Sequence, residues 1–226
     1  MKVSWRTEVI PLALIAAMFV LAVIAWPQAP DRIPIHWGFS GEPDNYAGKV
    51  FGLFGGPLIS LGIYGLIFIL PRIDPRRKNY ELFWSKYLVI RTIIITVLAC
   101  IQVVTFLWST GTDVNMNIAV FMIVGFLLIF LGNYMGKLRP TWFVGIRSPW
   151  TLSSKESWNK THRLGGWIFV IFGLALVIAA PFQEKWAFYT IAGTGAAALV
   201  FLYVYSYLVW KKDPDANPVG TRVSNR

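Results

Sequence analysis

Two apolar runs, each long enough to cross a bilayer, flank the stretch GNYMGKLRPTWFVGIRSPWTLSSKESWNKTHRLGG at residues 132–166. This stretch, called the central segment below, holds six of the chain's 21 Lys and Arg residues and three of its 11 tryptophans. Its only acid is Glu156. A basic, aromatic-rich loop beside a membrane is expected to lie against anionic headgroups or to bind an anionic or peptidic partner. The specific function of the chain is therefore expected in this segment.

Apolar blocks recur on both sides of the central segment. Of the 226 residues, 56% are apolar, which is too many for an ordinary soluble domain. Six blocks approach the roughly 20 residues that a helix needs to cross ~30 Å of hydrocarbon. They cover residues 9–26, 51–70, 88–108, 117–133, 167–181 and 187–210. The sequence thus predicts an all-α, polytopic membrane protein with six transmembrane helices.

The placement of the basic residues predicts how the chain is oriented. Alternating segments on one side hold 18 of the 21 Lys and Arg residues, and the other side holds only Arg32, Lys49 and Lys185. By the positive-inside rule, both termini and the central segment face the cytoplasm, and residues 27–50 lie outside. The net charge of +10 therefore reflects membrane topology and requires no direct contact with nucleic acid. The first apolar block is expected to be a retained signal anchor of a multi-pass protein of the cell membrane.

The predicted spans group into four regions. Residues 1–70 form an N-terminal hairpin of spans 1 and 2 with the outer loop 27–50. Residues 71–116 hold a basic inner connection and span 3. Residues 117–210 hold spans 4 to 6 with the central segment as an inner loop, and residues 211–226 form a polar tail.

Small and polar residues inside the spans predict helix contacts. Gly52, Gly56 and Ser60 recur every four residues and form a bare face against which another helix can pack. Gln102 is expected to make an interhelical hydrogen bond. Arg91 lies near the cytoplasmic end of span 3, where its side chain is expected to extend to the headgroups.

Within the central segment, the pattern Ser153-x-x-Glu156 is typical of a capping box. It predicts a short amphipathic helix that starts at Ser154 and stops at Gly165. Such a helix at the interface would place Trp158 among the headgroups.

Groups that perform chemistry are scarce. The predicted spans contain no Asp, Glu, Lys or His at membrane depth, and the chain has no HExxH, GxSxG, P-loop or CxxC motif. The single Cys100 excludes an intramolecular disulfide. His36 has carboxylates nearby at Asp31, Glu42 and Asp44, but their spacing is unlike that of a zinc site. We expect no catalysis, no metal and no cofactor.

Two other functional classes are weighed against binding. A small transporter or exporter of a peptide or lipid is the alternative, although no charged site is visible in the spans. A membrane enzyme that uses His162 is a third reading. It would be supported if His162→Ala abolished an activity at an unchanged protein level.

Two stretches carry a resemblance to known families. The central segment is similar to the SdpI-family signature, in which a GNYM element precedes RPNYFVGIRTPWTL and a Trp-x-x-Thr-His-Arg-x-Gly-Gly element follows. This chain departs from it at Thr141, Trp142 and Ser148. The stretch IPIHWGFSGEPD at residues 33–44 resembles the DUF1648 domain that often precedes the SdpI element.

The SdpI family comprises bacterial membrane immunity proteins that protect against a secreted antimicrobial peptide toxin. The resemblance implies a six-span protein that protects its host from such a toxin, and the scarcity of chemical groups favours action by binding. From the founding member it also implies signalling, in which the toxin-bound protein holds a cytosolic autorepressor at the membrane. The residues that the resemblance implies for the inner site are Asn133, Arg139, Pro140, Gly145, Arg147, Pro149, Trp150, Trp158, His162 and Arg163. The predicted topology separately suggests that the outer loop faces the toxin, with His36, Trp37, Gly41, Pro43 and Asp44 as the candidate residues. The expected partners are thus membrane lipids, a secreted peptide toxin and a cytosolic autorepressor.

Overall fold

The computed structural model describes residues 4–38, 41–182 and 185–216. Within these ranges six helices are long and apolar enough to cross a membrane. They are α1 (Trp5–Ala25), α2 (Lys49–Ile73), α4 (Trp84–Ser109), α5 (Met116–Met135), α7 (Lys155–Ala179) and α8 (Lys185–Lys211). The remaining elements are β1 (Arg32–Trp37), β2 (Pro43–Gly48), α3 (Arg77–Tyr80), a 3-10 turn (Glu81–Phe83) and α6 (Pro149–Ser153). The predicted helical, multi-pass membrane protein with six spans is confirmed.

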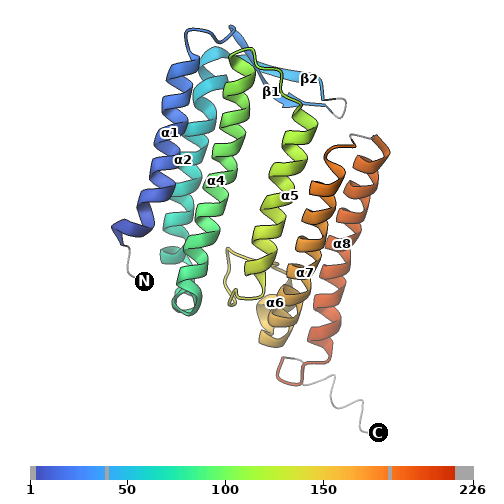
Figure 1. Cartoon of the computed structure of the whole chain (residues 1–226). Helices are drawn as coiled ribbons and strands as arrows, with labels where there is room; N and C mark the ends of the chain where they lie inside the picture. Colours follow the sequence, from blue (N-terminus) through green and yellow to red (C-terminus); the bar gives the residue numbers. More distant parts are fainter. Residues whose placement is uncertain (1–3, 39–40, 183–184, 217–226) are drawn as a thin grey trace.

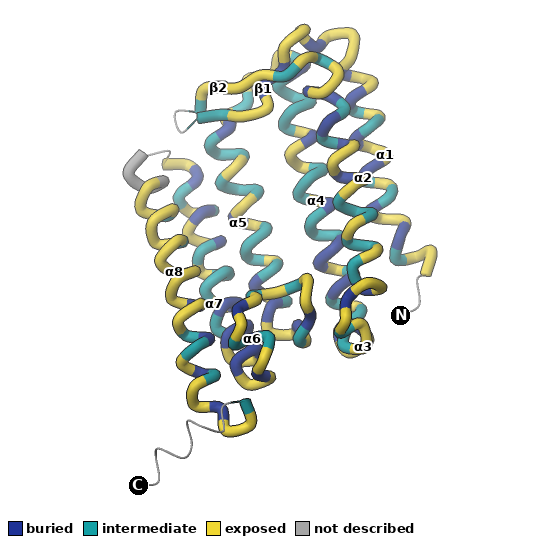
Figure 2. The backbone as a smooth tube through the Cα atoms, turned by 180° about the vertical axis from the view of Figure 1, so that it is seen from behind, coloured by how far each residue is buried: buried dark blue, intermediate teal, exposed yellow. Residues whose placement is uncertain are grey.

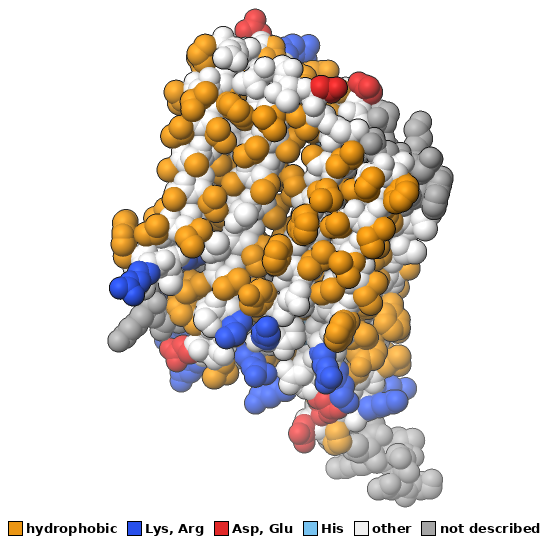
Figure 3. Space-filling view, in the orientation of Figure 1, with side chains coloured by type: hydrophobic (Ala, Val, Ile, Leu, Met, Phe, Trp, Pro, Cys, Tyr) orange, Lys and Arg blue, Asp and Glu red, His pale blue; other side chains and the backbone are white. Residues whose placement is uncertain are grey.

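The long helices form two groups of three. Helices α1, α2 and α4 pack together, α7 packs between α5 and α8, and α4 contacts α5 across the middle (Figures 1 and 2). Helix α1 begins and α8 ends at the same end of the bundle, and the β1–β2 hairpin lies at the other (Figure 1). On the face shown in Figure 3, Lys and Arg gather at the first of these ends and a hydrophobic band covers the middle. This arrangement fits the charge pattern from which the cytoplasmic orientation was predicted.

The outer loop contains a two-stranded antiparallel sheet that the sequence did not predict. The prolines and glycines of this loop disfavour a regular helix between α1 and α2. Strand β1 rests on the first turn of α2, where a side-chain carbon on Gly52 would lie 2.5 Å from the Cβ of Ile33. Ile33 and Leu53 are fully buried in the same cluster. Gly52 therefore packs against the hairpin.

The rest of the predicted glycine face of α2 packs against α4. A Cβ on Gly56 would lie 2.5 Å from the side-chain oxygen of Gln102. The amide nitrogen of Gln102 donates to the carbonyl of Leu53 over 3.1 Å, and Ser60 is fully buried. The predicted helix-packing seam is confirmed at Gly56 but not at Gly52, which meets the hairpin. The predicted interhelical hydrogen bond of Gln102 is confirmed.

Helices α5 and α7 touch backbone to backbone at two glycine pairs. A Cβ on Gly132 would lie 2.6 Å from the carbonyl oxygen of Gly166, and one on Gly173 would lie 2.5 Å from that of Gly125. The pairs are seven residues apart on each helix, which is two turns. Small residues of this kind let membrane helices approach closely. The crossing fixes the two ends of the central segment, residues 132 and 166, against each other.

The predicted short helix of the central segment is wrong in its extent. Ser154 is indeed the N-cap, because its hydroxyl accepts from the N–H of Ser157 over 2.9 Å. The helix does not stop at Gly165 but continues to Ala179 as the fifth span. Gly165 is needed for close packing, since a Cβ there would lie 2.6 Å from the side chain of Ile146.

The predicted position of the Arg91 side chain is also wrong. Arg91 is 1% exposed and does not extend to the headgroups. Its guanidinium donates to the carboxylate of Glu8 over 2.9 Å, and Tyr64 donates to the other carboxylate oxygen. The pair ties α1, α2 and α4 together. The hydropathy block that begins at residue 9 had excluded Glu8, whereas α1 begins earlier, at Trp5.

Candidate functional site

The central segment enters the fold through a capped turn. Ser148 is the N-cap of α6, and its hydroxyl accepts from the N–H of Thr151 over 3.1 Å. The Thr151 hydroxyl in turn accepts from the N–H of Ser148 over 2.9 Å, which completes a capping box. The capping box therefore lies at Ser148, and the predicted one at Ser153 is not formed. Pro149 occupies the first turn, where its missing N–H costs no hydrogen bond.

A stack of two rings forms the core of the segment. The imidazole of His162 lies 3.9 Å from the ring centre of Trp158 at 20°, and both side chains are fully buried. The Trp158 indole donates to the carbonyl of Leu138 over 3.1 Å. The prediction that Trp158 lies among the headgroups is therefore wrong. Trp158 lies at the centre of a packed cluster. Figure 2 shows buried residues concentrated near α6.

Both ring nitrogens of His162 bind the backbone. Nε2 accepts from the N–H of Ile146 over 2.9 Å, and Nδ1 lies 2.8 Å from the carbonyl of Trp158. Because an amide can only donate, Nε2 must be unprotonated and Nδ1 must carry the proton. Gly145, with φ of 115°, passes directly over the rings, and a Cβ there would lie 2.3 Å from Nε2. His162 thus positions residues 145–146, and in this structure it faces no open site.

Asp74 joins the central segment to the connection between α2 and α3. It is 2% exposed and follows the last residue of α2. Its carboxylate accepts from the N–H of Arg76 over 2.7 Å, the hydroxyl of Tyr80 over 3.0 Å and the N–H of Trp142 over 2.9 Å. The sequence argument missed Asp74. An acid flanked by a run of cations, directly after a span, was the available signal.

A basic pocket of about 860 Å³ opens where these two connections meet. Arg76, Arg77 and Lys78 line it from the α2–α3 side, and Arg139 and Lys155 from the central segment. The Asn79 side chain donates to the carbonyl of Pro140 over 2.6 Å, and Arg76 donates to that of Leu152 over 2.6 Å. These two long-range hydrogen bonds hold the walls together.

The other side of the segment packs on α8 through small hydroxyls. The hydroxyls of Ser148 and Ser206 lie 2.8 Å apart, and Ser157 donates to the carbonyl of Ser206 over 2.8 Å. Ser154 donates to the carboxylate of Asp213, just past the end of α8. All of these side chains are buried. The segment is therefore fixed on both sides.

The ten residues predicted for the inner site do not form one cluster. Trp158 and His162 form the buried core, and the exposed Gly145 lies over their rings. Trp150 packs on Tyr203 and Tyr207 of α8 with ring centres 4.9 and 5.1 Å away. Arg139 and Pro140 line the basic pocket. The other members are Asn133, whose amide donates to Ile129 on its own helix; Arg147, which donates to the carbonyl of Trp142 over 2.8 Å; Pro149; and the exposed Arg163.

The outer end of the bundle holds a second polar pocket. It has a volume of about 620 Å³ and lies between the β1–β2 hairpin and the α4–α5 turn. Three of the five predicted outer residues, Trp37, Gly41 and Pro43, line it. The other two pair with each other, because Nδ1 of His36 lies 2.5 Å from the carboxylate of Asp44. Gly41 has φ of 81°, which favours glycine at that turn.

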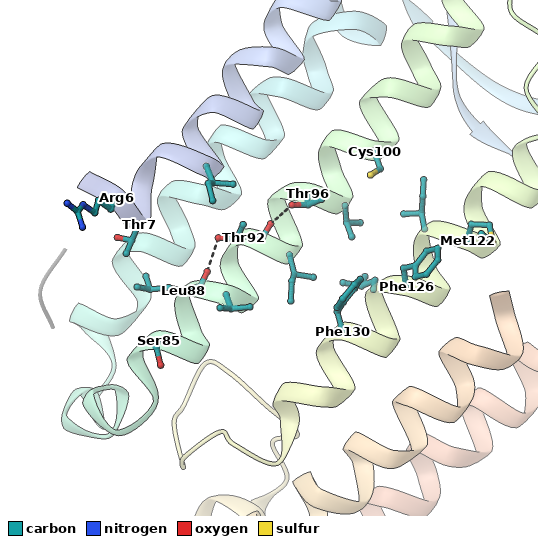
Figure 4. A pocket seen from close by; sticks show the side chains of 16 residues that line it. Arg6, Thr7, Ser85, Leu88, Thr92, Thr96, Cys100, Met122, Phe126 and Phe130 are labelled. Atoms are coloured by element: carbon teal, nitrogen blue, oxygen red, sulfur yellow. Dashed lines mark hydrogen bonds between the residues drawn. The ribbon is translucent and has the colours of Figure 1, made fainter. Parts of the chain in front are cut away.

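An apolar groove of about 730 Å³ runs between α1, α4 and α5 (Figure 4). The hydroxyls of Thr92 and Thr96 point along it but donate to carbonyls on their own helix, Leu88 and Thr92, over 3.0 and 2.9 Å. The groove therefore has little to offer a polar ligand, and aliphatic and aromatic side chains dominate its walls. No group of three or more metal-ligating side chains occurs among the described residues.

Two stretches of the chain match known protein families. Residues 137–206 match the SdpI/YfhL protein family, and residues 13–61 match a domain of unknown function, DUF1648. The predicted resemblance to the SdpI family is confirmed. The chain is also 27% identical over 207 residues to the protein named Immunity protein SdpI from Bacillus subtilis (strain 168), covering 92% of this chain and 97% of that protein. No solved structure matches.

The two family regions cover different parts of the fold. The DUF1648 match covers the β1–β2 hairpin and the start of α2. The SdpI/YfhL match covers most of the central segment and its contacts with α8. Arg76 to Asn79, which complete the basic pocket, lie between the two matched regions.

Proposed function

We propose that this chain is a membrane immunity protein that protects its cell against a secreted antimicrobial peptide toxin. The observation that carries the proposal is the similarity to Immunity protein SdpI along almost the whole of both chains. The protein acts by binding the toxin and performs no catalysis. The buried, backbone-bonded His162 supports this part, because the one histidine of the central segment serves to hold the fold.

The toxin-binding site in this proposal is the pocket at the hairpin end. Trp37 and Trp108 give it aromatic surface, and Glu42 and Asp113 give it negative charge. Among the described residues that line it there is no Lys or Arg. Aromatic rings and carboxylates together suit an amphipathic, cationic peptide, since the rings bury apolar side chains and attract cations. The neighbouring His36–Asp44 pair joins the two strands of the hairpin at an exposed site.

A survival assay in toxin-sensitive bacteria tests the proposal. It compares wild type, Asp113→Asn, Trp37→Ala and an empty vector, with the membrane level of each protein measured by blot. Asp31→Asn is the matched control, because it removes the same charge from an exposed site at the same end that does not line the pocket. Wild type and the control should protect, and the two pocket variants should not. A well-expressed wild type that gives no protection against several such peptides would refute the immunity function.

The central segment carries the signalling half of the proposal. We place the autorepressor contact on its exposed residues, with Arg147, Trp142 and Phe143 at the centre. The test measures transcription of the protein's own gene after toxin is added. Arg147→Ala should abolish the rise and Lys212→Ala, another exposed cation at the same end of the bundle, should not. Equal induction in all three proteins would refute the contact at Arg147. No induction in wild type would remove signalling from the proposed function and leave immunity standing.

A further inference from the structure

The basic pocket collects cations from two parts of the chain that are far apart in sequence. Arg77 and Lys78 come from α3, and Arg139 and Lys155 come from the central segment. Arg76 completes the set, positioned by its hydrogen bond to the carbonyl of Leu152 and by the ring of Trp142, 5.8 Å from the guanidinium carbon. Like charges repel, so folding five cations around one space costs free energy unless an anion fills it.

The protein supplies little negative charge to this pocket. No Asp or Glu lines it, and none of the five cations forms an ion pair with a described carboxylate. Two acids are bonded to its walls, Asp74 and Asp213, but they are 2% and 5% exposed and are occupied by internal donors. Glu156 pairs with Lys160 over 2.5 Å. The pocket is therefore left with a positive excess.

The position of the pocket also points to a particular kind of anion. It lies where the apolar part of α2 ends at Ile73 and where α7 begins at Lys155, which is the headgroup level of a bilayer. Leu82, 70% exposed, lines it beside the cations and offers apolar surface. The first turn of α7 adds backbone N–H groups and the positive end of the helix dipole. Basic pockets between transmembrane helices are suited to anionic lipid headgroups.

We propose that this pocket binds the phosphate of a phosphate ester, and that the bound group bridges α3 to the central segment. The ester is supplied by an anionic phospholipid of the surrounding leaflet or by a soluble phosphate ester. This ligand site does not depend on the proposed immunity function.

Native mass spectrometry of the full-length protein in detergent micelles tests the site. Phosphatidylglycerol, phosphatidylcholine, soluble glycerol phosphate and polyglutamate are titrated separately onto wild type and R77Q/K78Q/R139Q. The control K86Q/K211Q/K212Q removes the same number of charges from residues at the same end that do not line the pocket. K155Q alone is a second test variant, which keeps the proposal testable if the triple variant fails to fold. Lys155 is exposed, so its replacement should disturb the fold little.

Wild type and the control should retain phosphatidylglycerol in preference to phosphatidylcholine. Each neutralised pocket cation should weaken binding by about fivefold, so the triple variant should lose about 100-fold and K155Q about fivefold. Retention of glycerol phosphate as well would identify a soluble ester as the source; retention of the lipid alone would identify the leaflet. Equal lipid binding by all four proteins, or equal loss in the control, would overturn the proposal. So would binding of polyglutamate without binding of any phosphate, which would assign the pocket to an acidic protein partner.

Discussion

The imidazole of His162 fills the space that a side chain on Gly145 would need. A Cβ on Gly145 would lie 2.3 Å from Nε2, and that nitrogen already accepts from the next amide along, Ile146. One residue thus supplies the space and the other supplies the acceptor that fixes the turn between residues 141 and 148. The relationship makes the two positions interdependent.

Gly145→Ala should destabilise the protein by roughly 1–3 kcal/mol from overpacking alone. The positive φ of 115° adds backbone strain for any residue with a Cβ. Thermal unfolding of the purified protein in detergent measures the loss. An unchanged transition temperature would mean that the stack of Trp158 on His162 is not rigid in solution.

His162→Ala should lower stability because it leaves the N–H of Ile146 without its acceptor inside the protein. The carbonyl of Trp158 loses only the imidazole donor, since it still accepts the helical N–H of residue 162. A buried unsatisfied polar group costs about 1–3 kcal/mol. The measurement is thermal unfolding beside the neighbouring exposed variant Arg163→Ala, which should be close to wild type. If His162→Ala kept full stability and level but lost protection, His162 would act directly in function and the positioning role would be wrong.

Arg91→Met should be strongly destabilising, by about 3–5 kcal/mol, because it leaves Glu8 buried without its cation. Glu8→Gln combined with Arg91→Met should recover much of that loss, since neither charge then remains. A double-mutant cycle on unfolding free energy gives the coupling between the two side chains. Additive effects would show that the pair contributes nothing as a pair.

Gly132→Ala should push α5 away from α7, because the new methyl would lie 2.6 Å from the carbonyl oxygen of Gly166. We expect a loss of about 1–3 kcal/mol. The matched control is Gly193→Ala in α8, where no atom lies within 4 Å of the added carbon. It should be neutral or slightly stabilising, because Ala favours a helix over Gly by about 1 kcal/mol. Equal unfolding temperatures for the two variants would show that α5 and α7 do not pack closely at Gly132 and Gly166.

The six spans could be predicted from the sequence because a bilayer imposes one strong requirement, about 20 apolar residues in a row. The seam at Gly56 and the hydrogen bond of Gln102 followed from the same reasoning, since a buried amide must find a partner. The side of the membrane predicted for each end rests on charge placement and stays a prediction.

The remaining features depend on contacts between distant residues. Gly165 reads equally well as a helix stop or as a close-packing site, and only Ile146, nineteen residues earlier, decides between them. Glu8 and Arg91 are 83 residues apart, so no local sequence pattern indicates that they form a pair. The cations that the central segment gives to the basic pocket could be recognised in the sequence as a binding surface. Those of Arg76 to Lys78 indicated only the orientation of the chain in the membrane.

The contact of Gly132 with Gly166 closes the central segment into a ring at its base. The two ends of the central segment lie at almost the same point, so both move together with this one crossing of α5 and α7. The far side of the segment is held separately, by the α2–α3 connection and by α8. A shift of α5 relative to α7 would therefore move the base of the ring against its own outer contacts. A change in the spacing of two helices would thus alter the shape of the surface at this end of the molecule.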